Sequence, residues 1–308
     1  MRPVAGSGLL VVGDVVTDVV ARHRGALAAG TDTVAAIRTV PGGAGANVAC
    51  WAAHAGCRDV TLLGRVGAES ARWHEAALVA AGVRPRLVLD DEAPTGAVIC
   101  LVDEADGAER TFLTDSGACL RIGPEDWSAG RLDGVGWLHL SGYLFFSATG
   151  RALVTAAVRD ARARGVPVST DPASAGFLRE LGTARFLALA DGVDVLVPSR
   201  AEAALLAGAA GPEEAGAKLS GRFPVVVVKA GPDGACVARG GVVRERVPAP
   251  SDVVVRDSTG AGDAFTGALI AARLCGDGWR EAVVAGCRAG ATAVGRVGGR
   301  PPERRGPT

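Results

Sequence analysis

The sequence predicts an α/β fold in which a central, mostly parallel β-sheet is flanked by helices and a small β-sheet forms a lid. From residue 135 onward, apolar segments alternate with helical ones, as in successive β-α-β units. These apolar segments have no polar face, which is typical of strands buried on both sides. Residues 15–40 and 95–114 carry looser β-type patterns without helices between them. We expect them to form the lid, over the carboxyl edge of the main sheet.

The individual elements follow from apolar runs and helix signals. Leu9 to Gly13 predicts a buried strand, and the small residues of 44–55 predict a helix entered through Pro41. Further strands are expected at 135–142, 165–170, 193–197 and 224–228. Further helices are expected at 148–164, 174–190, 200–207, 268–274 and 279–294.

The domain organisation is expected to be simple. Residues 1–298 should form a single α/β domain that includes both lid segments. The last ten residues, 299–308, are rich in proline, arginine and glycine and cannot bury a core. We therefore expect a flexible C-terminal tail there.

Composition and charge exclude several classes of protein. The 308 residues are 48% hydrophobic and 21% charged, which is typical of a globular chain. Thirty-three basic residues balance 33 acidic ones, so the positive surface of a nucleic-acid-binding domain is not expected. The longest apolar runs fall far short of the roughly 20 residues that span a bilayer. With no secretory signal pattern and no paired cysteine motif, we expect a cytoplasmic protein with free thiols and no membrane partner.

The segment with the most chemical information runs from Asp257 to Gly267 and precedes a predicted helix. Glycines at 260 and 262 let backbone N–H groups converge on an anion such as phosphate. Asp263 then falls in the first turn of the helix. A carboxylate beside an anion site suits a base that takes a proton from a hydroxyl during phosphoryl transfer. The segment indicates a kinase, although on its own it is equally compatible with a glycine-rich turn before a helix.

Other nucleotide and catalytic motifs fail on inspection. The run Gly42 to Asn47 lacks the Lys-Ser/Thr of a P-loop, and Val48 stands where a dinucleotide fingerprint needs its third glycine. The chain has no G-x-S-x-G elbow, and its four histidines form no HExxH pattern. A dehydrogenase, a serine hydrolase and a zinc protease are therefore not indicated.

Two segments together resemble the signatures of the ribokinase-like (PfkB) carbohydrate kinases. They are Gly42-Gly-Ala-Gly-Ala-Asn47 near the start and Asp257-Ser-Thr-Gly-Ala-Gly-Asp263 near the end. Their order and separation match, and the resemblance extends from about Leu9 to Gly299. It implies a ribokinase-like fold, ATP as the phosphoryl donor and Mg²⁺ as the required metal. Because several relatives pair their lids, it also implies a homodimer through the lid.

The resemblance implies roles for individual residues. Asp263 matches the catalytic base, and Gly260, Ala261 and Gly262 match the anion hole for the γ-phosphate. The positions that bind the acceptor hydroxyls are Asp18, Gly42, Gly43 and Asn47. A carboxylate and an amide side chain can bind vicinal hydroxyls with fixed geometry. Without the family, Asp18 is compatible with a turn at a strand end and Asn47 with a helix cap.

Nucleotide and cation positions follow in the same way. The nucleotide-binding positions are Lys229, Gly231, Gly234 and Thr259. From the residues alone, Lys229 to Gly234 predicts a tight turn between strands. The positions of a K⁺ site built largely from carbonyls are Asp257, Thr259, Ala293, Arg296 and Gly298.

One departure from the family concerns magnesium. Ser199 stands where the family carries the Asn of an Asn-x-x-Glu motif, while Glu202 keeps the carboxylate that acts on Mg²⁺ indirectly. A serine can still hydrogen-bond a metal-bound water, so we expect rearranged metal organisation and retained activity. Asp171, before Pro172, resembles a position near the triphosphate and is equally compatible with a turn aspartate.

The sequence thus predicts ATP-dependent phosphorylation of a hydroxymethyl group on a sugar or sugar-like acceptor. A nucleoside kinase of the same fold is the alternative, and it would need an aromatic pocket for the base. The aromatic residues near candidate lid or acceptor positions are Phe112, Tyr143, Phe145 and Phe146. A non-catalytic sugar-binding or regulatory protein is a third hypothesis, which only Ser199 favours. The identity of the acceptor is left open, because lid contacts decide it.

Overall fold

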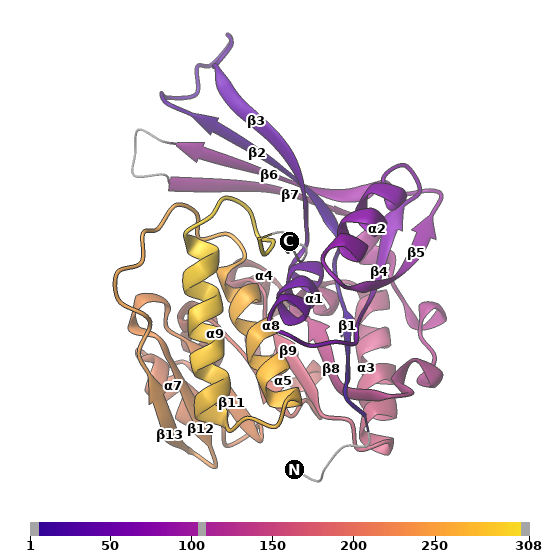
Figure 1. Cartoon of the computed structure of the whole chain (residues 1–308), viewed down its shortest axis with the longest axis vertical. Helices are drawn as coiled ribbons and strands as arrows, with labels where there is room; N and C mark the ends of the chain where they lie inside the picture. Colours follow the sequence, from indigo (N-terminus) through magenta and orange to yellow (C-terminus); the bar gives the residue numbers. More distant parts are fainter. Residues whose placement is uncertain (1–5, 104–108, 303–308) are drawn as a thin grey trace, which may run out of the picture.

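The structure is a computed structural model of the chain, and it describes residues 6–103 and 109–302. Its strands form two sheets, a large one in the body of the molecule and a small one projecting from one end (Figure 1). Helices pack against both faces of the large sheet. The predicted α/β fold with a small β-sheet lid is therefore confirmed.

The large sheet has nine strands and is mostly parallel. They are β1 (Gly8–Val12), β4 (Val60–Gly67), β5 (Arg84–Asp90), β8 (Val135–Ser141), β9 (Val168–Asp171), β10 (Val195–Leu196), β11 (Val225–Lys229), β12 (Ala235–Arg239) and β13 (Val242–Val247). Their order is β13-β12-β11-β10-β9-β8-β1-β4-β5, and only the β11–β12 and β12–β13 pairs are antiparallel. The carboxyl ends of β1, β8, β9, β10 and β11 therefore meet along one edge, where ligands bind in open α/β folds.

Side chains of each strand alternate between two hydrophobic cores. On β1, Leu9 and Val11 belong to one core and Leu10 and Val12 to the other. The first core is covered by α1 (Ala44–His54), α2 (Ala71–Ala80), α8 (Ala261–Leu274) and α9 (Trp279–Val294). The second is covered by α3 (Ala148–Ala163), α4 (Ala175–Leu181), α5 (Thr183–Leu189), α6 (Arg200–Ala207) and α7 (Pro212–Leu219). This double coverage explains why central strands such as β1 and β11 are apolar on both faces.

The lid is a four-stranded sheet in the order β3-β2-β6-β7. Its strands are β2 (Val16–His23), β3 (Ala35–Gly42), β6 (Thr95–Asp103) and β7 (Glu109–Gly117). β2 and β6 are parallel, and each forms an antiparallel pair with its own outer neighbour. In cross-strand register, Asp18 pairs with Val98 and Val98 with Thr114, so these side chains share one face.

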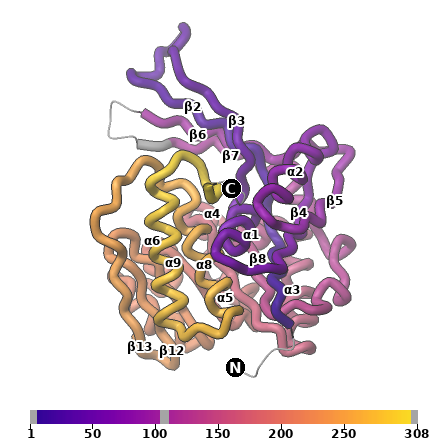
Figure 2. The backbone as a smooth tube through the Cα atoms, in the orientation of Figure 1, coloured from indigo at the N-terminus to yellow at the C-terminus, as the bar shows by residue number. Residues whose placement is uncertain are grey.

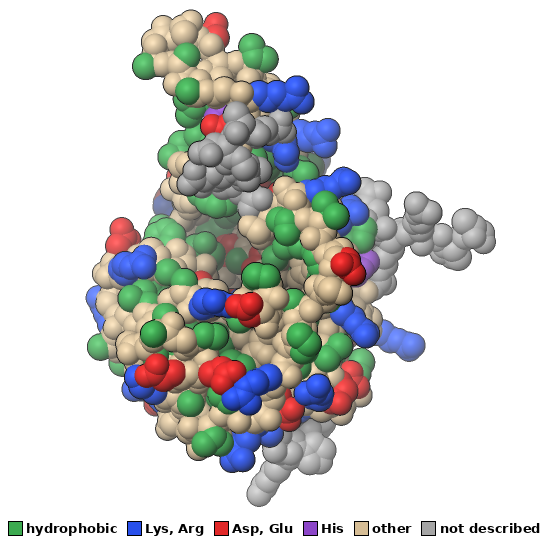
Figure 3. Space-filling model, turned by 90° about the vertical axis from the view of Figure 1, so that its left-hand side faces the viewer, with side chains coloured by type: hydrophobic (Ala, Val, Ile, Leu, Met, Phe, Trp, Pro, Cys, Tyr) green, Lys and Arg blue, Asp and Glu red, His purple; other side chains and the backbone are tan. Residues whose placement is uncertain are grey.

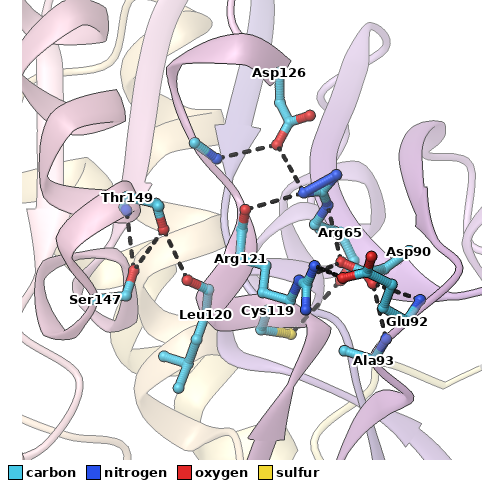
Figure 4. Close-up of polar contacts among 12 residues, drawn as sticks. Arg65, Asp90, Glu92, Ala93, Cys119, Leu120, Arg121, Asp126, Ser147 and Thr149 are labelled. Atoms are coloured by element: carbon cyan, nitrogen blue, oxygen red, sulfur yellow. Dashed lines mark hydrogen bonds and ion pairs between the residues drawn. The ribbon is translucent and has the colours of Figure 1, made fainter.

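The connections between body and lid are held by a polar cluster (Figure 4). Asp90, the last residue of β5, accepts hydrogen bonds from the Ala93 amide at 2.8 Å and the Glu92 amide at 3.0 Å. Its carboxylate also pairs with Arg121 at 2.9 Å, just beyond β7. Arg65 of β4 donates to the Arg121 carbonyl at 3.0 Å. The entry to β6 and the exit from β7 are thereby tied to β4 and β5.

The structure differs from the predicted elements in several places, among them the following. The predicted helix 174–190 is two helices, α4 and α5, because Gly182 lies between them with φ 88°. The region of β4, α2 and β5 had no prediction. Among the described residues, no helix is both long and apolar enough to cross a membrane. All seven cysteines are free thiols, as expected.

The expected flexible tail is anchored where it begins. From the end of α9 the chain turns back toward the root of the lid (Figure 2). There the Gly299 carbonyl accepts a hydrogen bond from Trp51 Nε1 at 2.8 Å, and Arg300 donates to backbone carbonyls near Gly42. Residues 303–308 lie outside the described part of the chain. The expectation of a loose segment from residue 299 therefore does not hold for Gly299 and Arg300.

Candidate active site

A cavity of about 1120 Å³ lies between the lid and the carboxyl edge of the main sheet. The space-filling view shows the molecule hollowed there (Figure 3). Lid residues such as Asp18 line one side, and residues after β8, β9 and β11 line the other. The first turns of α1 and α8 contribute Asn47 and Asp263. Both glycine-rich segments of the sequence therefore open onto one cavity.

Asp263 lies in the first turn of α8 and borders the cavity. Its Oδ2 accepts a hydrogen bond from Asn47 Nδ2 at 2.9 Å. Protein surrounds the carboxyl group, and this burial raises its pKa from the ordinary 3.8 to about 7, with the Asn47 hydrogen bond and Lys229 opposing the rise. A carboxylate with a pKa near neutrality can accept a proton and release it again, as a general base requires.

Backbone amides converge beside this carboxylate. Gly260 precedes α8 in the left-handed region with φ 72°, and Gly299 packs so closely that a Cβ at 260 would lie 2.5 Å from its Cα. The Ala261 amide donates to the Ser258 carbonyl at 3.3 Å. The amides of Gly262 and Asp263 have no acceptor in the part of the chain that the structure describes. Two unpaired N–H groups at a helix N-terminus form an anion site.

The acceptor side of the cavity is built from Asn47 and Asp18. While Asn47 Nδ2 donates to Asp263, its Oδ1 is buried and has no partner among the described residues. A buried polar atom without a partner is costly, so Oδ1 is suited to receive a ligand hydroxyl. Asp18 lies against the Gly42 backbone, where a Cβ would fall 2.3 Å from the carboxylate. Burial raises the Asp18 pKa to about 7, and nearby Arg300 opposes this rise.

The opposite side carries a buried ion pair. Lys229, the last residue of β11, donates from Nζ to Asp171 Oδ2 at the end of β9. Thr266 Oγ1 donates to the same oxygen at 3.2 Å. Asp171 Oδ1 accepts from the Ala173 amide at 3.2 Å, so Asp171 is a turn aspartate that also faces the cavity. The lysine assigned to nucleotide binding is thus ion-paired in this structure.

Ser199 and Glu202 cap helix α6. The Ser199 hydroxyl accepts from the Glu202 amide at 3.4 Å, and Glu202 Oε2 accepts from the Ser199 amide at 2.8 Å. This reciprocal pair is a capping box. Glu202 still lines the cavity, and its pKa is raised by burial and by the nearby Asp171. One of its oxygens is therefore committed to the helix and the other is available for a metal-bound water.

Most of the residues singled out from the sequence line this one cavity. Those that do are Asp18, Gly43, Asn47, Glu202, Lys229, Gly231, Thr259, Gly260, Gly262, Asp263 and Gly298. Those that are not among its lining residues are Gly42, Ala261, Gly234, Asp257, Ala293 and Arg296. Gly42 and Ala261 neighbour lining residues in the chain. Gly234, with φ 85°, forms the tight turn that its segment predicts.

The comparisons with known proteins decide the family. The description "pfkB family carbohydrate kinase" matches residues 7–305. The chain belongs to this family. It is 31% identical over 274 residues to a fructokinase from Klebsiella pneumoniae, covering 85% of this chain and 82% of that protein. It is 33% identical over 275 residues to an ATP-dependent ribose-1-phosphate kinase from Halopiger xanaduensis, covering 88% and 86%.

A solved structure supports the same assignment. It is a ribokinase II from E. coli in complex with ATP and Mg²⁺, and it superposes with a TM-score of 0.82 at 25% identity. The match covers 95% of this chain and 94% of that one. The protein is therefore a pfkB family carbohydrate kinase with a ribokinase-like fold.

Two of the residues predicted for a K⁺ site, Thr259 and Gly298, are joined through Asp257. Its Oδ1 accepts from the Thr259 amide at 2.8 Å and its Oδ2 from the Gly298 amide at 2.9 Å. The Ala293 carbonyl accepts from the Arg296 amide at 3.0 Å. Thr259 Oγ1 is buried without a partner among the described residues. An oxygen-lined site with an orphan hydroxyl fits a monovalent cation.

The residues of the kinase also fit Mg²⁺ bound with a nucleotide. No group of three His, Cys, Asp or Glu side chains within the described ranges is placed to hold a metal ion alone. Asp171 and Glu202 nonetheless line the cavity beside the anion site. Mg²⁺ usually keeps several waters and is held by one or two carboxylates and by phosphates. This donor set suits that mode of binding.

Sequence reasoning missed three parts of the kinase site. Asp14, after β1, accepts from the Ala44 amide at 2.6 Å, the Gly45 amide at 3.1 Å and Ser141 Oγ at 2.7 Å. It therefore holds the start of α1, and its place at a strand end is a signal that could have revealed it. The anchor Arg300 was assigned to the tail.

The third missed part is aromatic. Tyr143, Phe146 and Phe177 line the cavity near α4. Phe146 and Phe177 are stacked with ring centroids 5.0 Å apart, and Tyr143 meets Phe177 edge-on at 5.8 Å. Tyr143 and Phe146 were noted as candidates, whereas Phe177 had no signal in the sequence. Phe145, the other candidate there, is fully buried in the core.

Proposed function

We propose that the kinase transfers the γ-phosphoryl group of ATP to a hydroxymethyl group of a sugar or sugar-like acceptor. The observation that carries this proposal is the arrangement at the mouth of α8. There Asp263 has a pKa of about 7 beside the unpaired amides of Gly262 and Asp263. The acceptor residues Asp18 and Asn47 line the same cavity.

The chemistry of the step follows from these positions. Asp263 takes the proton of the acceptor hydroxyl while the oxygen of that hydroxyl bonds to the γ-phosphorus. The bond from that phosphorus to the bridging oxygen breaks, and ADP leaves with the electron pair. The anion hole was expected from the amides at 260–262, but the Ala261 amide is bonded to the Ser258 carbonyl, so the unpaired N–H groups of Gly262 and Asp263 stabilise the charge on the phosphoryl oxygens. Bound Mg²⁺ would neutralise phosphate charge, with Glu202 acting through water.

Acceptor and nucleotide positions are assigned accordingly. Asp18, Gly42, Gly43 and Asn47 bind the acceptor hydroxyls. Lys229, Gly231 and Thr259 contact the nucleotide, and Gly234 supports the turn that carries Gly231. Activation by K⁺ at the Asp257 site belongs to the same proposal, supported by the orphan hydroxyl of Thr259.

A second candidate function is a nucleoside kinase. The observation that favours it is the aromatic group of Tyr143, Phe146 and Phe177. Flat aromatic rings exposed to a cavity can stack on a nucleobase.

We further propose that two copies pair through their lids. On the face opposite Asp18, Ile37, Ile99 and Leu113 are 64%, 38% and 54% exposed. Ile99 pairs directly with Leu113, and Ile37 lies one row away beside Ala21. An apolar face of this kind on a projecting sheet is suited to contact its own copy.

The proposed function is tested by ADP release with a panel of acceptors, each with and without K⁺. The panel contains ribose, fructose, their phosphates, 2-keto-3-deoxygluconate and nucleosides. Turnover with a sugar supports the first proposal, and preference for nucleosides supports the second. Binding of acceptors without any turnover would instead support a non-catalytic sugar-binding or regulatory protein.

A further inference from the structure

Lys229 occupies an unusual position in this kinase. It is one of only two lysines among 33 basic residues, and the other, Lys218, lies on the exposed face of α7. The side chain of Lys229 is only 12% exposed. A Cβ built on Gly262 would lie 3.2 Å from its Nζ, so the ammonium group lies beside the first turn of α8. It therefore lies next to the proposed anion hole.

The hydrogen bonding of Lys229 is incomplete. An ammonium group has three N–H donors. Asp171 Oδ2 is the acceptor for one of them, and no other described residue accepts from Nζ. The side chain lines the cavity, so the remaining donors are available to a ligand. Unsatisfied donors on a buried cation are costly unless an anion joins them.

The charge of Lys229 is maintained by its surroundings. Burial disfavours the ammonium form, but Asp171, Glu202 and Asp263 outweigh burial and raise the pKa of Lys229. The group is therefore a cation over the whole physiological range. A compact ammonium also fits beside Gly262, where a planar guanidinium would need more room.

We propose that Lys229 is a catalytic residue whose ammonium group donates to the oxygens of the phosphoryl group during transfer. This inference rests on the proposed function and adds a side-chain cation to the backbone amides. Lys229 keeps its proton throughout, because the acceptor proton goes to Asp263 and the electron pair leaves with ADP. Asp171 and Thr266 act as positioning residues that hold the ammonium against α8.

A purely structural role is the competing explanation. Lys229 could serve only to neutralise the buried Asp171, in which case Lys229→Met would fail because it leaves an unpaired carboxylate. A double variant separates the two roles. In D171N/K229M neither charge remains, so the fold no longer contains a buried unpaired ion.

The experiment measures kcat, KM for both substrates, and thermal unfolding for K229M, D171N and D171N/K229M. Lys218→Met is the matched control, since it removes the other lysine from an exposed site. We expect K229M to lower kcat by about 10²–10³-fold, as for the loss of one donor to a transition-state oxyanion. We expect the double variant to regain stability without regaining turnover, with a nearly unchanged KM for the acceptor.

A failure of the Lys229 inference can be distinguished from a failure of the proposed kinase activity. K229M with the kcat of the wild type, or a double variant that is more active than K229M and as active as D171N, would show that Lys229 only balances charge, and it would overturn the inference. That conclusion holds when the wild type is active and D263N is inactive. A wild type inactive toward every acceptor would instead overturn the proposed function itself.

Discussion

The carboxyl group of Asp263 combines its proposed role as a base with an energetic cost. Burial raises its folded-state pKa to about 7, so proton abstraction is expected to become efficient only as the pH rises through this value. We predict that kcat/KM rises with pH up to about 7 and that Asp263→Asn lowers kcat by about 10²–10⁴-fold while nucleotide binding is retained. A pH–rate profile with calorimetric ADP titration tests this. Full turnover by D263N would contradict the role of base.

The same pKa has a consequence for stability. A carboxyl group whose folded-state pKa is raised loses stability as the pH rises from its unfolded value of 3.8 toward 7, because the unfolded chain ionises first. The loss is complete above about 7. D263N should therefore be more stable than the wild type at pH 8 and differ little near pH 4 in denaturant unfolding. The raised pKa that suits Asp263 to its proposed role as a base therefore lowers the stability of the folded protein above about pH 7.

Short motifs single out Asp263, Asn47 and Asp18, and the structure places all three at one cavity. Asp263 and Asn47 were recognisable because each belongs to a glycine-rich motif, and Asp18 because it matches a position of the family. Asp14 and Arg300 act through contacts between distant segments, such as that of Arg300 with Pro41, 259 positions away. No local pattern in a single sequence encodes such a contact.

At the scale of elements, the strap from Gly298 to Arg300 links both glycine-rich segments. Gly298 bonds Asp257, the Gly299 carbonyl bonds Trp51 of α1, and Arg300 donates to the carbonyls of Pro41, Gly42 and Ala46 at 3.1–3.3 Å. Gly42 is the last residue of β3 and supports the Asp18 carboxylate. The strap therefore sets the position of the proposed acceptor residues relative to α8.

We predict that Arg300→Met raises the acceptor KM on the order of tenfold, or about 1.4 kcal/mol, with little change in the KM for ATP. The substitution leaves the carbonyls of Pro41, Gly42 and Ala46 without the Arg300 donor. It also removes the positive charge that opposes the raised pKa of Asp18. Acceptor binding should therefore weaken further toward lower pH. Steady-state kinetics at two pH values measure this, with the exposed Arg222→Met as control. An unchanged acceptor KM would show that the strap is only a structural anchor.

Elements with strong periodicity were predictable, and those decided by context were not. Helix α9 was expected at 279–294 and spans those residues. The helix expected at 174–190 is broken by Gly182, whose positive φ ends α4. Strand β10, between β9 and β11, is reduced to Val195–Leu196 because only these residues pair with the two neighbouring strands. Tertiary pairing, not local propensity, decides such boundaries.

At the scale of the whole molecule, the class of fold was predictable but the strand order was not. The alternation of apolar and helical segments indicated a parallel sheet, whereas the insertion of β1 between β4 and β8 depends on pairing between distant segments. This insertion places Asp14 beside Ser141 and opens the site in the middle of the edge. The cavity is thus a product of topology as well as of the motifs.

The lid also gives the whole molecule a surface that a monomer would leave exposed. Its outward face presents Ile37 and Leu113. A charged side chain at either position would have to lose its water to pack against a second copy, which would weaken pairing. We predict that the wild type sediments as a dimer and that I37E/L113E shifts it to a monomer. Because each lid should be held by its partner, the variant should also bind acceptor more weakly. The control is Val242→Glu on β13, 45% exposed and remote from the lid in sheet order. A wild type that sediments as a monomer at every concentration, or a dimer unaffected by I37E/L113E, would contradict pairing through this face.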